Sequence, residues 1–69
     1  MAFSLAHNIH RRRLDAGFSQ VRLAQLTGLS QTWISRLENG EENPSLETLK
    51  RLALAFGVGL TNLLEDSAA

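Results

Sequence analysis

The stretch SQVRLAQLTGLSQTWISRLENG, from Ser19 to Gly40, decides the fold. It holds two short amphipathic segments, one on each side of Gly28. A serine precedes each segment, where its hydroxyl can accept a hydrogen bond from the free N–H groups of a starting helix. Apolar residues at helical spacing give both segments a side to bury; they are Leu23, Ala24, Leu29, Ile34 and Leu37. Two helices joined by about three residues that include a glycine form the helix-turn-helix pattern.

The second segment, Gln31 to Glu38, has a polar side that contains no acid. Read as a helix, it places four polar side chains within an arc of about 140°; these are Gln31, Thr32, Ser35 and Arg36. Glutamine can bind the adenine edge, arginine the guanine edge, and threonine a polar edge or a thymine methyl. A polar helix face that merely meets water is the alternative. The turn, the serine caps and the sign of the charge together favour DNA recognition.

Further residues extend this pattern in both directions along the chain. They are Gly17-Phe18-Ser19-Gln20, Leu23-Ala24, Gly28-Leu29-Ser30, Ile34-Ser35-Arg36-Leu37-Glu38-Asn39-Gly40, Pro44-Ser45-Leu46-Glu47-Thr48-Leu49, Leu52-Ala53, Phe56-Gly57-Val58 and Leu63-Leu64. With them the chain resembles the phage repressor and Cro class of helix-turn-helix regulators, the XRE family. The resemblance implies an all-α, lambda-repressor-like domain of five short helices in residues 1–69, with the helix-turn-helix at about 20–39. Residues 65–69 are expected to form a frayed tail.

Composition bounds the function. The 69 residues carry seven basic and seven acidic side chains and no cysteine. Residues 1–36 have a balance of +4 and residues 37–69 a balance of −4, so the basic half can face phosphates with modest non-specific affinity. No apolar run reaches the ~18 residues of a membrane span, and no signal peptide is recognisable. We expect a cytoplasmic protein with no membrane contact.

A first helix is expected from Leu5 to Ala16, and it carries an arginine on its apolar stripe. Arg13 follows Leu5 and Ile9 at helical spacing. A buried charge without a partner is very costly, and the resemblance implies that an arginine and a glutamate pair at the positions of Arg13 and Glu38. We therefore expect a structural salt bridge between them, while a phosphate contact by Arg13 stays open. Arg11 and Arg12 should point elsewhere, free to meet DNA or water.

Two histidines and the single tryptophan have other interpretations. His7 and His10 stand three residues apart, but no third ligand is near, so we expect surface histidines and no metal site. Trp33 borders the buried arc and should pack in the core, with a phosphate contact as the alternative.

The expected DNA-binding residues divide by role. Gln31, Thr32 and Arg36 would read bases. The residues that would mainly position the DNA backbone are Gln20, Ser30, Ser35 and Asn39; for Gln20 and Asn39 this follows from the resemblance. Glu41 and Glu42 should repel phosphate, and the loop that holds them is left outside the binding surface.

The C-terminal third is expected to supply core and dimer contacts, at about 46–64. The fourth helix should bury one stripe, made of Leu46, Leu49, Leu52, Ala53 and Phe56. A fifth helix, Leu60 to Leu64, follows. Its surroundings are more apolar than one small core needs, and the surplus can pair with a second copy.

The sequence thus predicts a sequence-specific regulator of double-stranded DNA that acts as a homodimer, most simply a repressor on an inverted repeat with half-sites about 34 Å apart. The alternative is an antitoxin or interaction module of the same fold, whose main partner is a toxin or another regulator. The sequence shows no nucleophile–base pair, carboxylate dyad or metal set, so we expect neither an enzyme nor a cofactor.

Overall fold

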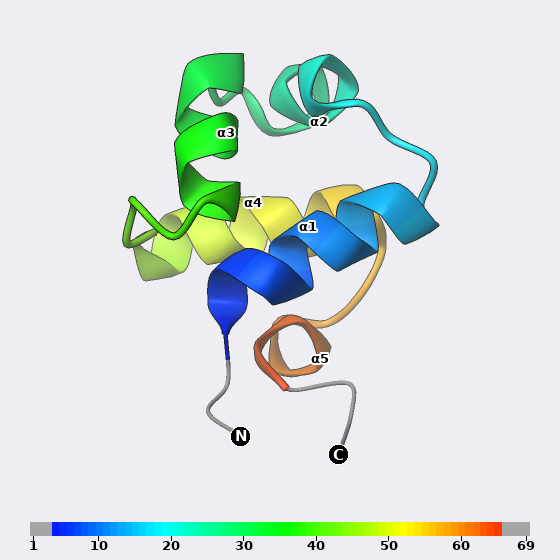
Figure 1. The fold of residues 1–69 in the computed structure, drawn as a ribbon. Helices are drawn as coiled ribbons and strands as arrows, with labels where there is room; N and C mark the ends of the chain where they lie inside the picture. The colour runs from blue at the N-terminus through cyan, green and yellow to red at the C-terminus, as the bar shows by residue number, and fades with distance from the viewer. Residues whose placement is uncertain (1–3, 66–69) are drawn as a thin grey trace.

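The structure is a computed structural model that describes residues 4–65, and this part of the chain consists of five α-helices and their connections (Figure 1). The helices are α1 (Leu5–Asp15), α2 (Gln20–Thr27), α3 (Gln31–Glu38), α4 (Leu46–Phe56) and α5 (Leu60–Leu64). The expected all-α fold is confirmed, although α1 ends at Asp15, one residue earlier than predicted. Of the expected tail, residues 66–69 lie outside the described residues.

Serine caps fix where the first four helices begin. In each case the hydroxyl oxygen accepts the backbone N–H three residues further on, as side chains at this position commonly do. The capping serines are Ser4, Ser19, Ser30 and Ser45. At the other end of α2, Gly28 adopts a left-handed conformation with φ of 75°, which L side chains rarely tolerate. Cap and glycine together fix the short turn between α2 and α3.

The core draws on all five helices. Its fully buried side chains are Ile9 from α1, Leu23 from α2, Ile34 and Leu37 from α3, Leu52 from α4 and Leu63 from α5. Trp33 is half-buried and packs against this cluster, as favoured from the sequence. Leu46 corrects the expected stripe of α4: it is 56% exposed. It is the first residue of α4, and this end of the helix extends beyond the core.

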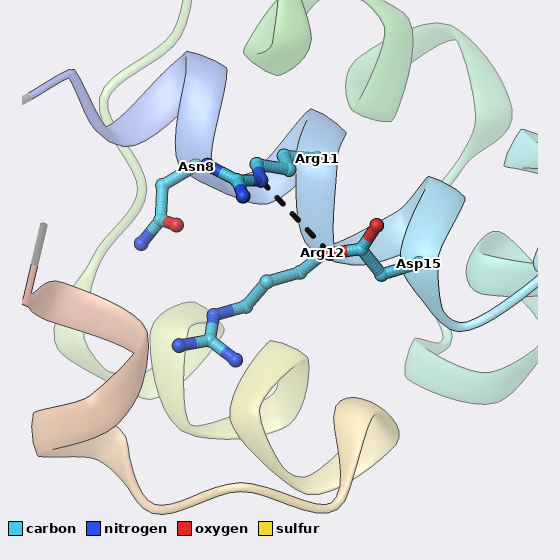
Figure 2. A pocket seen from close by; sticks show the side chains of 4 residues that line it. All are labelled: Asn8, Arg11, Arg12 and Asp15. Atoms are coloured by element: carbon cyan, nitrogen blue, oxygen red, sulfur yellow. Dashed lines mark ion pairs between the residues drawn. The ribbon is translucent and has the colours of Figure 1, made fainter. Parts of the chain in front are cut away.

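Helices α2 and α3 pack on each other above α4, and α5 packs beneath α1 and α4 (Figure 1). The carbonyl groups at the end of α5 have no hydrogen-bond donor within the helix. Side chains of α1 donate to them instead. The buried Asn8 donates through Nδ2 to the carbonyls of Leu63 and Glu65. Arg12 reaches from α1 toward α5 (Figure 2), and its Nη2 lies 2.8 Å from the carbonyl oxygen of Asn62.

The expectation that Arg12 is free for DNA is therefore wrong. Its position on α1 faces α5, and its guanidinium is used to hold that helix. Arg11 lies on the outer side of α1 beside Asp15, with 4.0 Å between Nε and Oδ2 (Figure 2).

Replacing Asn8 should loosen α5. We expect Asn8→Ala to lower the free energy of unfolding by about 1–3 kcal/mol, since it leaves the buried carbonyl oxygen of Leu63 without this donor. Denaturant unfolding of the purified protein measures this. Asn62→Ala is the matched control, because it removes an exposed amide and leaves the backbone carbonyl that Arg12 binds. Equal stability of the two variants would contradict the role given to Asn8.

Candidate nucleic-acid interface

The polar arc of α3 lies at the surface and borders a depression. Gln31, Thr32 and Arg36 are exposed and Ser35 is half-exposed, while Ile34 and Leu37 on the opposite side are buried and fix the rotation of the helix. The depression has a volume of about 330 Å³ and is lined by these four polar residues together with Gln20 from α2. The turn at Gly28 thus brings the start of α2 beside the exposed side of α3.

The other two expected binding residues, Ser30 and Asn39, lie at the ends of α3 and do not line this depression. The Ser30 hydroxyl accepts the backbone N–H of Trp33, at 3.0 Å. A hydroxyl that accepts one hydrogen bond can still donate its own proton to a phosphate oxygen. Asn39 is exposed at the C-terminal end of the helix.

Arg13 and Glu38 form a two-point ion pair beneath this surface. Arg13 donates from Nε to Oε2 of Glu38 at 2.7 Å and from Nη2 to Oε1 at 3.1 Å. Its Nη1 donates to the carbonyl of Phe18 at 2.9 Å. The side chains of Arg13 and Glu38 are 9% and 4% exposed, so Arg13 faces inward and has no access to a phosphate.

The same carboxylate has two further partners that the sequence analysis missed. Nδ1 of His10 lies 2.8 Å from Oε1 of Glu38, and Nε2 of Gln20 donates to that oxygen at 3.2 Å. The side chain of His10 is 44% exposed, so it lies at the surface as expected, but it also takes part in this network. The available signal was its spacing: His10 precedes Arg13 by three residues and shares its side of α1. The contact of Gln20 with Glu38 depends on the path of the chain before α2, and residue spacing does not reveal that path.

These contacts set the charge of Glu38. Burial is the largest single influence and raises its pKa, but the hydrogen bonds from Arg13, His10 and Gln20, with the charge of Arg13, together outweigh it. The pKa of Glu38 therefore lies below its ordinary value, and the carboxylate is ionised at neutral pH.

Arg36 also meets acids that were expected to stay apart from the binding surface. Its Nε lies 3.1 Å from Oε2 of Glu42 and 3.9 Å from Oε1 of Glu41. The loop turns back along α3 because Gly40 has a φ of +80° and the N–H of Glu41 donates to the carbonyl of Arg36 at 2.9 Å. The two acids thus border the arginine of the polar arc.

A smaller depression, about 100 Å³, lies on α1 between Asn8, Arg11, Arg12 and Asp15 (Figure 2). Arg12 and Asn8 already hold α5, so this hollow belongs to the packing of α1 on α5. Residues 4–65 contain no group of three or more His, Cys, Asp or Glu side chains placed to hold a metal ion. Within the same range, no helix is long and apolar enough to cross a membrane.

A helix-turn-helix whose exposed helix presents hydrogen-bonding side chains free of acids defines a class of DNA-binding domain. The comparison with known families agrees: the model described as helix-turn-helix matches residues 9–63. The chain belongs to the XRE-type helix-turn-helix family of transcriptional regulators.

Individual proteins resemble this chain in sequence or in fold. A hypothetical transcription factor from Neisseria meningitidis serogroup B is 37% identical over 87% of the chain, which spans 57% of that protein's length. The control protein C.SmaI from Serratia marcescens is 38% identical over 87% of the chain and 71% of its own length. The biofilm regulator SinR from Bacillus subtilis, crystallised in complex with DNA, superposes with a TM-score of 0.82. That match has 26% identity and covers 88% of this chain and 98% of the other.

Breaking the buried ion pair on one side should destabilise the fold. We expect Glu38→Ala to lower the free energy of unfolding by about 3–5 kcal/mol, because Arg13 is left buried without its counter-charge. The double variant Arg13→Met with Glu38→Leu should recover much of the loss, since neither side chain is then charged. Thermal unfolding of the three proteins measures this. A Glu38→Ala protein as stable as the parent would contradict the structural role of the pair.

Proposed function

We propose that this chain binds specific sequences of double-stranded DNA as a homodimer and represses transcription from an inverted-repeat operator. In this proposal α3 enters the major groove. Gln31, Thr32 and Arg36 then face base edges. The residues that contact the sugar-phosphate backbone are Gln20, Ser30, Ser35 and Asn39.

The depression beside α3 supports this proposal most directly. Polar side chains from two helices converge on it, and every side chain that lines it can donate a hydrogen bond. None of them is acidic, although the chain as a whole has as many acids as bases. The complex of SinR with DNA supports the same partner, since that regulator shares the fold.

Exposed apolar side chains on α4 and α5 support the homodimer. Leu54 near the end of α4 is 82% exposed, and Leu64 on α5 is exposed as well. Val58 and Leu60 lie between them in the chain and are half-buried. Because a domain of this size buries only about 60% of its unfolded surface, covering these side chains with a second copy would add apolar burial that the monomer lacks.

Replacing Arg36 tests whether the exposed side of α3 contacts base edges. We expect Arg36→Ala to lower the preference at one base position in each half-site by about 1–3 kcal/mol, because a bidentate contact to one base edge is lost. Duplexes selected from a random pool by the parent, together with their single-base variants, are the probes. Binding is measured at one fixed salt concentration.

Arg11→Ala is the control, since Arg11 is exposed on α1, outside the reading helix. It should weaken all duplexes equally or have no effect. An Arg36→Ala protein that keeps the parent's full base preference would refute the assignment of α3. A parent that prefers no duplex at all would favour the alternative, an interaction module for a protein partner such as a toxin.

The oligomeric state tests whether the exposed apolar side chains on α4 and α5 are covered by a second copy. We expect the parent to sediment as a dimer and Leu54→Glu to shift it toward the monomer, because the new charge would have to be buried at the interface. Leu14→Glu is the control: Leu14 is exposed on α1, away from α4 and α5 in the sequence. A parent that remains a monomer when bound to DNA, on an asymmetric single site, would rule out the dimer.

A further inference from the structure

The two acids beside Arg36 differ in their distance from it and in their burial. The Arg36 side chain is 55% exposed, whereas that of Glu42 is only 24% exposed. Glu42 approaches at 3.1 Å and Glu41, which is largely exposed, at 3.9 Å. Glu42 is thus the closer and more buried of the two acids, and Arg36 is the residue that faces outward.

The backbone just before Glu42 is held at the end of α3. The N–H of Gly40 donates to the carbonyl of Leu37 at 3.0 Å, and the N–H of Glu41 donates to that of Arg36 at 2.9 Å. With the left-handed Gly40, these bonds close the end of α3 and direct the loop back along the helix. The helix end therefore brings the loop backbone back beside α3, from where the side chain of Glu42 reaches Arg36.

The approach is at Nε, on the side of the guanidinium nearest the helix. A guanidinium carries five N–H donors in a rigid fork, so one engaged at Nε can still present its terminal nitrogens to the O6 and N7 acceptors of guanine. The carboxylate of Glu42 restricts the directions in which that fork can point.

The local charge separates two kinds of DNA contact. Arg36 has one positive charge, and Glu41 and Glu42 place two negative charges within 4 Å of it. A phosphate, itself negative, meets net repulsion at such a cluster. A base edge is neutral and binds through hydrogen bonds, so it does not. The arrangement opposes the contact that carries no sequence information.

We propose that Glu42 is a specificity-determining residue of the reading surface: its carboxylate holds Arg36 at Nε and keeps the guanidinium away from backbone phosphates. This inference rests on the proposed function, in which Arg36 reads a base. Removing the charge of Glu42 releases Arg36 to bind any phosphate, so that non-specific DNA gains more affinity than the operator does.

The test compares Glu42→Gln with the parent on two duplexes, one selected from a random pool by the parent and one with the same composition in scrambled order. The affinity for the scrambled duplex should rise by up to about five-fold, the upper end for a released exposed ion pair. The affinity for the selected duplex should rise less, so the ratio of the two falls. The salt dependence on the scrambled duplex should steepen by about 0.9 in the log–log slope, one additional phosphate contact.

Two further proteins separate this effect from a general change in charge. Glu47→Gln makes the same change in net charge at another glutamate that pairs with an arginine, at 3.9 Å from Arg51 on α4. It should alter both affinities by the same factor. Adding Glu42→Gln to Arg36→Ala should leave the affinity ratio of Arg36→Ala unchanged, because the residue through which Glu42 acts is absent. Circular dichroism and thermal unfolding establish that each variant is folded.

The inference is overturned if Glu42→Gln affects the two duplexes in the same proportion as Glu47→Gln, or if it lowers the ratio equally when Arg36 is absent. If either result is found while the parent still prefers its selected duplex, the proposed function stands and only the role of Glu42 is refuted. A parent that prefers no duplex overturns both.

Discussion

The carboxylate of Glu38 is the point on which the rest of the structure depends. Burying it is costly, and Arg13, His10 and Gln20 offset the cost with hydrogen bonds. Those partners come from α1 and α2, while Glu38 is the last residue of α3, so one ionised group fixes the mutual positions of three helices. Because its pKa is lowered, this contribution is present above the ordinary pKa of a glutamate and is lost as the pH falls through the lowered value.

The same group connects stability to the candidate interface. Gln20 lines the depression beside α3 and also donates to Glu38, so its amide is held by the network that holds the helices. A side chain tied on one side loses less conformational freedom when it meets a phosphate. The network beneath the surface thus orients a residue on it, and the fold and the proposed recognition of DNA share one set of contacts.

Charge placement matters more than net charge in this molecule. The chain is neutral overall, yet the depression is lined by polar side chains and one arginine. The acids nearest that arginine stand beside it at the end of α3 and not within the depression. In the proposed function, attraction to phosphates is therefore weak, and recognition would come from hydrogen bonds to base edges, which depend on sequence.

The sequence by itself determined the local structure. Serine caps, glycine ends and apolar spacing act over three or four residues, so they set the helices, the turn at Gly28 and the polar side of α3. The pairing of Arg13 with Glu38 was expected because an arginine on an apolar stripe needs a counter-charge and because the family resemblance implies this partner. Contacts between distant segments needed the tertiary structure: Asn8 and Arg12 on the end of α5, and His10 and Gln20 on Glu38. The structure also decided the approach of the nearby Glu42 to Arg36 and the exposure of Leu46. They follow from the angles at which helices pack and the path of one loop, and no short stretch of sequence encodes either.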